Sequence, residues 1–238
     1  MFIDSRLAVV VLSAFLLTCA WGWTPPTYNS TVYNAFANKT LLNPLPPILS
    51  NPYDDPNFNT TWINTVCAVR YPSPDNRSFY YLENYESPAA AEAAGAYVTH
   101  LHPCGQCSTT RDLSVYMKYS DLTEPVRICA LESILNDTWA LECLENIGFS
   151  YECSVIWLYD AENTRKECFD ICIYDYIENV PNNLPPNSTN LNPCLQCDED
   201  KSGPIFKVVA GRTRRDCGLA SSINRPPQDI YEVTHYYY

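Results

Sequence analysis

Residues 123–172, TEPVRICALESILNDTWALECLENIGFSYECSVIWLYDAENTRKECFDIC, decide the fold that we expect for this chain. The stretch repeats the signals that start helices, in which a capping side chain is followed by a Pro or an acidic residue. These signals stand at Thr123 with Glu124 and Pro125, at Asp137, at Ser150, and at Thr164 with Glu167. Gly148 is placed to end the second segment. The pattern predicts four short helices in a row.

The same stretch contains five cysteines: Cys129, Cys143, Cys153, Cys168 and Cys172. Cys168 and Cys172 are four residues apart, so on a helix they share one face and can both point into a core. The sequence therefore predicts a mainly α fold with irregular loops, in which several short helices are cross-linked by disulfides.

The flanking segments add less regular structure. Before the stretch, Ser87 and Pro88 begin a helix over AAAEAAGAYVTHL that we expect to end before Pro103. After it, IFKVVAG predicts one or two short strands near residues 204–211. Residues 24–85 are rich in Pro and Asn, so we expect mostly irregular chain, with short strands near residues 65–70. The final segment, SSINRPPQDIYEVTHYYY, is expected to be extended.

The N-terminal residues resemble a secretory signal. Arg6 precedes the apolar run LAVVVLSAFLLTCA, and small residues suited to cleavage follow. The alternative is an anchor retained in the membrane. Cleavage divides the chain into a signal peptide (1–22), a glycosylated irregular segment packed on the core (23–85), and a disulfide-rich helical domain with a Tyr-rich tail (86–238).

Six sequons for N-glycosylation support the secretory route, because they matter only in a secretory lumen. They are Asn29, Asn38, Asn59, Asn76, Asn136 and Asn187. Together with the signal, they predict a secreted or cell-surface glycoprotein with no stable membrane span after cleavage. In that oxidising compartment, disulfides are the expected state of cysteines.

The number of cysteines after cleavage is odd, so they cannot all pair within one chain. The chain has 12 Cys, of which Cys19 lies in the signal, so 11 remain after cleavage. The disulfide candidates are Cys67, Cys104, Cys107, Cys129, Cys143, Cys153, Cys168, Cys172, Cys194, Cys197 and Cys217. An odd number implies a free thiol or a bridge to another chain. With three tyrosines ending the chain, this favours protein partners or self-association.

Two C-x-x-C pairs, CGQC (Cys104, Cys107) and CLQC (Cys194, Cys197), leave three interpretations open. Each cysteine can bridge to a distant partner, as in most disulfide-rich secreted proteins. Cys104 and Cys107 can instead form a redox pair, making the protein a lumenal thiol–disulfide oxidoreductase. The two pairs can also join in a four-thiolate zinc site.

Other motifs suggest ligands more weakly. His100 and His102 precede CGQC and can ligate a metal, although on a helix end their rings diverge. The segment DEDKSG offers Asp198, Asp200 and Ser202 in the alternate spacing of a calcium loop. A Val stands where that loop needs a bidentate Glu, so a solvated acidic turn is the competing interpretation.

The only basic cluster is Arg212, Arg214 and Arg215. These side chains can bind an anion, but we expect them to pair inside the protein, because the net charge is −12. With only 15 Lys and Arg, nucleic acid is a poor partner. No G-x-S-x-G, H-E-x-x-H, P-loop or dinucleotide motif is present. We therefore expect no catalytic residues, no enzyme and no cofactor, and a binding, structural or self-assembly role. The alternatives are the oxidoreductase and a protein that binds zinc or calcium.

The half of the chain from Cys104 onward resembles an uncharacterised family of small secreted cysteine-rich proteins of unicellular algae and related protists. The resemblance is carried by CGQCSTTRDLSVY, TEPVRICAL, CLENIGFSYECSVIW, TRKECFDIC and CLQCDEDKSGPIFKVVAGRTRR. It implies one common fold that contains both C-x-x-C pairs, and it implies no activity.

Overall fold

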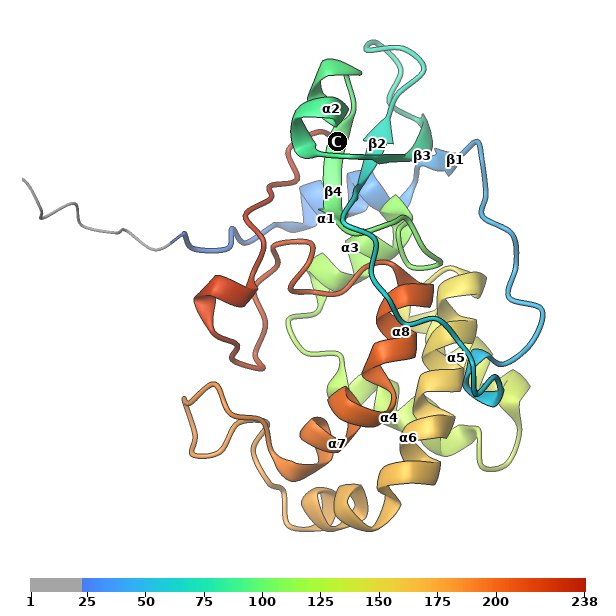
Figure 1. The fold of residues 1–238 in the computed structure, drawn as a ribbon, viewed down its shortest axis with the longest axis vertical. Helices are drawn as coiled ribbons and strands as arrows, with labels where there is room; N and C mark the ends of the chain where they lie inside the picture. The colour runs from blue at the N-terminus through green and yellow to red at the C-terminus, as the bar shows by residue number, and fades with distance from the viewer. Residues whose placement is uncertain (1–22) are drawn as a thin grey trace, which may run out of the picture.

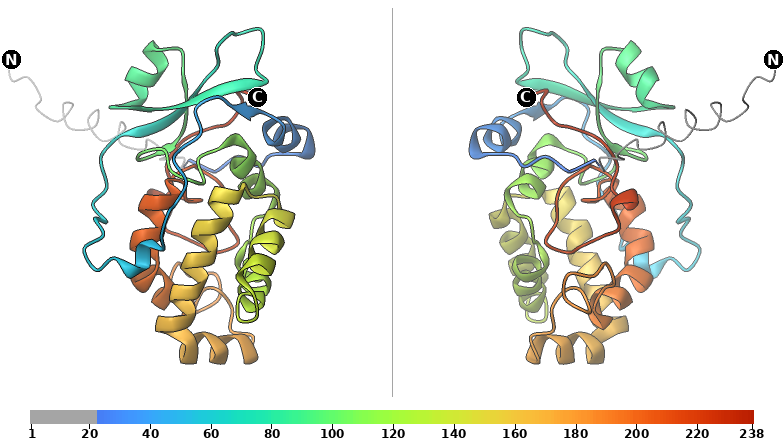
Figure 2. Two further views of the ribbon diagram at one scale, coloured as in Figure 1. Left: turned by 90° about the vertical axis from the view of Figure 1, so that its right-hand side faces the viewer. Right: turned by 90° about the vertical axis from the view of Figure 1, so that its left-hand side faces the viewer.

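A four-stranded mixed sheet lies at one end of the molecule, and a group of helices forms the rest (Figure 1). The computed structural model describes residues 23–238, so the predicted signal peptide lies outside the described residues. Within residues 23–238, eight α-helices hold 44% of the chain and the sheet holds 11%. Figure 2 shows the two layers from the side, with one long helix running away from the sheet.

The sheet has the order β1-β3-β2-β4. Its strands are β1 (Thr40–Leu41), β2 (Val66–Arg70), β3 (Phe79–Tyr85) and β4 (Tyr97–Leu101). The β1 strand runs parallel to β3, while β2 is antiparallel to both of its neighbours. On one face of β2, Val66 and Ala68 pack with α2 (Pro88–Ala93). Cys67 and Val69 face the main core, where α1 (Ser30–Ala37) and α3 (Thr110–Lys118) lie. The sheet is therefore covered on both faces.

The helical layer is built around α6 (Tyr151–Ile177), a helix of 27 residues. It contacts α4 (Thr123–Glu132) and α5 (Asp137–Ile147) on one side. On the other side it contacts α7 (Pro193–Lys201), α8 (Gly203–Ala210) and the short 3₁₀ turn η1 (Pro52–Asp54). A second 3₁₀ turn, η2 (Pro227–Asp229), precedes the C-terminal tail. The α6 helix is thus the element on which the others assemble.

The expected mainly α fold with one or two strands near residues 204–211 is wrong. A mixed sheet is present, and residues 203–210 form the helix α8. Pro204 stands in the first turn of α8, where its missing N–H costs nothing, and Phe206 and Ala210 are buried one turn apart. Burial on a helical spacing therefore outweighed the strand preference of the β-branched residues.

The two helices expected to start at Ser150 and at Thr164 form a single helix, α6. The Thr164 hydroxyl contacts Asp198 and Ser202, so it caps no backbone group and α6 runs through it. The helix predicted over residues 88–101 is also wrong in its second half. Gly95 adopts a left-handed φ of 69° and ends α2, after which Tyr97–Leu101 forms β4.

The front segment was expected to be irregular, and this is wrong where α1, β1 and β3 form. The strand expected near residues 65–70 is present as β2. The sheet joins β2 and β3 to β4 across residue 86. The boundary predicted at that residue therefore falls inside a hydrogen-bonded sheet.

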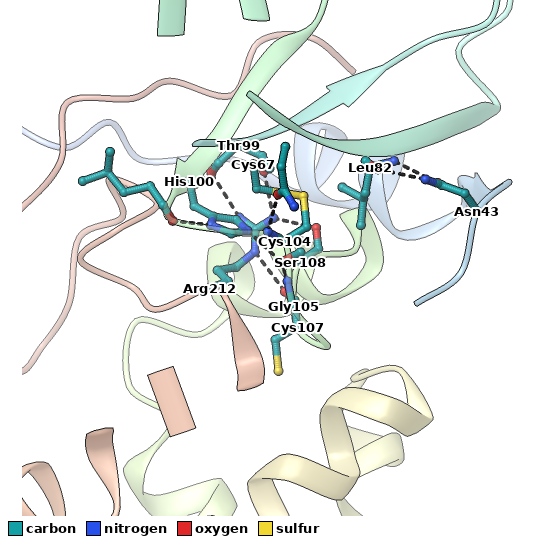
Figure 3. Close-up of a disulfide and its surroundings, with 12 residues drawn as sticks. Asn43, Cys67, Leu82, Thr99, His100, Cys104, Gly105, Cys107, Ser108 and Arg212 are labelled. Carbon is teal, nitrogen blue, oxygen red and sulfur yellow. Dashed lines mark hydrogen bonds between the residues drawn. A yellow bond between two sulfur atoms is a disulfide. The ribbon is translucent and has the colours of Figure 1, made fainter. Parts of the chain in front are cut away.

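One buried arginine joins the two layers (Figure 3). The Arg212 side chain is 0% exposed, and its guanidinium donates hydrogen bonds only to uncharged oxygens. Arg212 Nε donates to Cys107 O at 3.0 Å, and one terminal nitrogen donates to Thr99 Oγ1 at 2.7 Å and Ser108 O at 2.9 Å. The other terminal nitrogen donates to Thr99 O at 3.3 Å. A residue just after α8 therefore holds β4 to the loop that starts α3.

The backbone at this junction is packed too closely for any side chain. A Cβ atom on Gly105 would lie 2.5 Å from Gly211 N, and one on Gly211 would lie 2.3 Å from Gly105 N. Gly211 also has a φ of 73°, which disfavours other residues. The contact places Cys107 N and Gln106 N on the last carbonyls of α8, at 2.8 Å from Ala210 O and 2.9 Å from Val209 O.

Replacing Arg212 by Met is expected to destabilise the fold by about 3 kcal/mol or more, because three carbonyls and a hydroxyl lose their donor. The measurement is the free energy of unfolding in urea with the disulfides intact. Arg127→Met is the matched control: the Arg127 side chain is 32% exposed, pairs with Glu124 one turn away and lies over the Tyr176 ring, so its loss is expected to cost about 1 kcal/mol or less. Equal losses in the two variants would show that the buried network does not stabilise the fold.

Candidate functional site

Disulfide bonding, predicted from the sequence, is confirmed by five bridges. They are Cys67–Cys104, Cys107–Cys153, Cys129–Cys143, Cys168–Cys197 and Cys172–Cys194. Both members of CGQC bond to distant partners, as do both members of CLQC. The structure therefore forms neither the redox pair Cys104–Cys107 nor the four-thiolate zinc site, and the four cysteines take the structural role that was the first interpretation.

The remaining cysteine of residues 23–238, Cys217, is a free thiol. It is 0% exposed, and burial raises the pKa of its thiol. The C-terminal tail covers this region, because Nε2 of the buried His235 donates a hydrogen bond to Cys217 O at 2.8 Å. A bridge from Cys217 to another chain would require the tail to leave its place.

The tail itself is extended, as expected, but it is not a free contact arm. Val233, His235 and Tyr237 are buried, while Tyr236 and Tyr238 remain exposed. This alternation is that of a strand lying on a surface. Of the three final tyrosines, which suggested a contact with partners, Tyr237 is therefore not available at the surface.

The histidine and acidic motifs do not assemble into metal sites. His100 is buried with one ring nitrogen 2.7 Å from Ser108 Oγ and the other 2.6 Å from Leu101 O, whereas His102 stacks edge-on against Trp62. Asp198 and Asp200 lie on α7, where a calcium loop would need irregular chain. No group of three or more His, Cys, Asp or Glu in residues 23–238 is arranged to hold a metal ion.

All six sequon asparagines are exposed: Asn29, Asn38, Asn59, Asn76, Asn136 and Asn187. In three of them, the Oδ1 atom accepts a hydrogen bond from the backbone of the sequon Ser or Thr, at Thr61, Ser78 and Thr138. Glycosylation stays a prediction.

A groove of about 600 Å³ lies beside α6. It is lined along α6 by residues three or four positions apart, from Trp157 through Ala161 and Arg165 to Phe169, Ile173 and Tyr176. A stripe of this length covers roughly 28 Å of helix. The α4 helix and the turn after it form one wall, with Val126, Leu131 and Ile134. The α7–α8 pair and residues 219–230 form the other, and most of the lining surface is apolar.

Sequence reasoning missed this site because it divided α6 into two helices. The stripe is visible only when residues 151–177 are placed on a single helix, where positions 157, 161 and 164 share one side and the row continues at 165, 169 and 173, winding slowly around the helix. Two residues of the sequence motif DEDKSG, Asp198 and Glu199, line the groove.

The α7–α8 wall carries a cluster of charges. Glu199 contacts three cations: Lys207, Arg215 at 2.6 Å and Arg225 at 3.0 Å. Although burial opposes its ionisation, Arg215, Lys207 and Arg225 lower the pKa of Glu199 to about 2. One carboxylate therefore faces three positive charges at the surface of an otherwise apolar groove.

Two further carboxyls line the groove nearby. Burial raises the pKa of Asp198 to about 6, and burial together with the neighbouring Asp198 raises the pKa of Asp160 well above its usual range. The hydrogen bonds around Asp160 accommodate a proton there. The Tyr53 hydroxyl lies 3.0 Å from Asp160 Oδ1 and 2.9 Å from Ser202 O, and it has one hydrogen for two acceptors. A proton on Asp160 completes both hydrogen bonds.

Most arginines around the groove have structural partners. Arg214 donates to Tyr116 O at 2.8 Å and to Tyr119 O at the end of α3, and Arg165 donates to Ala130 O at 3.4 Å and Ser133 Oγ at 2.7 Å at the end of α4. Both positions favour a cation, because the carbonyl end of a helix carries partial negative charge. The internal pairing predicted for the basic cluster is therefore found, although only Arg215 pairs with a carboxylate.

The comparisons with known proteins describe a family without a known role. A model described as "Family of unknown function (DUF8771)" matches residues 137–233, which is less than half of the chain. The matched residues include α6, α7, α8 and the charged cluster, whereas the α4 wall and the sheet lie outside it. No curated protein and no solved structure matches. Among the helices of residues 23–238, none is both long enough and apolar enough to cross a membrane.

Disulfide mapping of the intact protein by mass spectrometry is expected to find the five bridges above, with Cys217 reduced. In a thiol assay, one thiol per chain is expected to react after unfolding and none in the native protein, because Cys217 is fully buried. If Cys104 bonded to Cys107, or if Cys217 reacted readily in the native state, the arrangement described here would be contradicted. Should residues 1–22 be retained, Cys19 would add one reactive thiol.

The free energy of unfolding is expected to depend on pH through the carboxyl group of Asp198. Its folded pKa of about 6 lies above the unfolded value near 3.9, so the folded state binds this proton more tightly and loses stability as the pH rises from about 4 through 6. When the pH is raised from 4.5 to 7.5, the free energy of unfolding of the wild type is expected to fall by about 2 kcal/mol relative to that of Asp198→Asn. Urea unfolding of both proteins at each pH measures this difference. A difference that does not change with pH would contradict the buried carboxyl.

Proposed function

We propose that this chain is a secreted, disulfide-framed binding protein that holds a small apolar ligand in the groove beside α6. The observation that carries the proposal is the groove itself. Its volume of about 600 Å³ falls in the range of small-molecule sites, and its walls combine apolar side chains with a few polar groups.

The pattern of disulfides supports this role. Two bridges, Cys168–Cys197 and Cys172–Cys194, tie α6 to α7 along the groove, so one wall is held in place before any ligand arrives. A preformed site avoids the entropy of ordering its own walls on binding. Five disulfides in a cysteine-rich chain also fit an extracellular protein.

Self-assembly, the other expected role, has less support. It depended on a free thiol and an exposed tyrosine tail, but Cys217 and Tyr237 are both buried. The groove residues come instead from five helices, α3, α4, α6, α7 and α8, that converge on one concave surface. The binding role expected from the sequence is therefore the one we retain, with the ligand being a small molecule.

The neutral apolar dye 1-N-phenylnaphthylamine is expected to bind with a saturable rise in fluorescence. In Ala161→Trp, the added ring fills the groove at the middle of the α6 stripe, and we expect dye affinity to fall about tenfold or more. The matched control is Ala93→Trp, which adds the same ring to an exposed position of α2, in the other layer.

Circular dichroism and thermal unfolding establish that both variants fold. Loss of dye binding in Ala161→Trp alone supports the groove. If the wild type does not bind the dye, or if the two Trp variants bind it equally well, the proposed function fails.

A further inference from the structure

The groove contains two features that indicate the chemical class of its ligand. One is an excess of positive charge on the α7–α8 wall, and the other is a pair of buried hydrogen-bond donors that have no partner. Neither feature is needed to hold an entirely apolar molecule.

The charge excess comes from Lys207, Arg215 and Arg225, which share the single carboxylate of Glu199. Asp198 is the second acidic group beside them, and its interactions with Lys207 and Arg225 are attractive. Burial and the neighbouring Asp198 raise the pKa of Asp160, which favours the neutral form of the third carboxyl. The wall therefore remains positively charged even when Asp198 is ionised. All three cations line the groove, and their side chains are 19–25% exposed, so they are accessible from it.

The unpaired donors are Tyr116 Oη and Trp157 Nε1. Tyr116 is only 3% exposed, and both residues line the groove. Phe149 lies between their rings, with centroids 5.8 Å from Tyr116 and 5.9 Å from Trp157, and Phe206 continues the row at 4.7 Å from Trp157. A buried donor without an acceptor is rare in native proteins, because it has lost its hydrogen bond to water. A ligand with acceptor oxygens would supply the missing partner.

The rest of the groove is apolar. From the level of Thr164, the α6 stripe continues through Phe169 and Ile173 to Tyr176, and the same groove is lined by Leu131 of α4 and by Ile134 just after it. These side chains are 38–57% exposed, although several of them are large hydrophobic residues that usually find cover. They form an apolar run that begins next to the charged wall.

From these observations, we propose that the ligand is an anionic amphiphile: its acidic head contacts Lys207, Arg215 and Arg225, and its apolar body lies along Phe169, Ile173 and Tyr176. This inference rests on the proposed function, because it names the class of ligand for the same groove. It adds a head-group subsite, which a simple apolar site would lack.

The test compares three probes by isothermal titration calorimetry, below the micelle concentration of the amphiphiles. They are 1-decanesulfonate, which stays anionic at all working pH values, 1-decanol, which has the same chain and no charge, and inorganic sulfate, which has the charge and no chain. Decanesulfonate is expected to bind at least tenfold more tightly than decanol, and sulfate alone is expected to bind weakly.

Two variants on separate elements remove the cations singly. Lys207→Met on α8 and Arg225→Gln in the C-terminal segment are each expected to weaken decanesulfonate binding about tenfold, while decanol binding changes less than twofold. Lys201→Met is the matched control, since this lysine is exposed on α7 and does not line the groove. It is expected to bind decanesulfonate like the wild type.

The possible failures are distinguishable. If decanol and decanesulfonate bind the wild type equally, or if Lys201→Met weakens binding as much as Lys207→Met, the head-group subsite is overturned while the apolar groove stands. If neither amphiphile binds, the proposed function fails as well. If sulfate binds as tightly as decanesulfonate, the apolar run has no part in binding, and the amphiphile is overturned.

Discussion

The buried guanidinium of Arg212 is the interaction on which the arrangement of the two layers depends. Arg212 lies just after α8 of the helical layer. Its side chain donates to Thr99 of β4 and to the carbonyls of Cys107 and Ser108 in the loop before α3, so the sheet, this loop and the helices meet at a single side chain. A buried charge is costly unless hydrogen bonds replace its water, and here four acceptors do so. Gly105 and Gly211 make the geometry possible by letting two backbones touch. The disulfide Cys107–Cys153 then ties the same loop to α6.

This junction explains why the sequence predicted the helices better than the fold. Local signals placed the starts of α4 and α5 correctly, with Asn136 capping α5 directly before Asp137, and the strand β2 was expected where it lies. The errors arose where a distant partner decided the outcome. Thr164 bonds to Asp198 instead of capping a helix, and the apolar residues of α8 are buried against Trp157 of α6. No local pattern contains such partners.

The site was beyond sequence reasoning for a related reason. Its charged wall combines Glu199, Lys207, Arg215 and Arg225, which come from α7, α8 and two loops. Their convergence depends on the α6–α7 bridges, whose connectivity cysteine counting cannot assign. What counting did establish is the odd cysteine. The structure identifies it as Cys217 and buries it under the C-terminal tail, so the thiol that suggested assembly is enclosed in the fold.

The distribution of the bridges gives the two walls of the groove different mechanical freedom. The α7 wall is tied to α6 by two disulfides, one turn of helix apart, so it cannot swing as a unit. The opposite wall, α4, is bridged only to α5, through Cys129–Cys143. That hairpin is held to α6 by side-chain packing, by the hydrogen bonds of Arg165 and by its own chain ends, with no disulfide to the facing wall. Displacement of the α4–α5 hairpin therefore widens the groove without breaking a bridge, while α7 stays tied to α6.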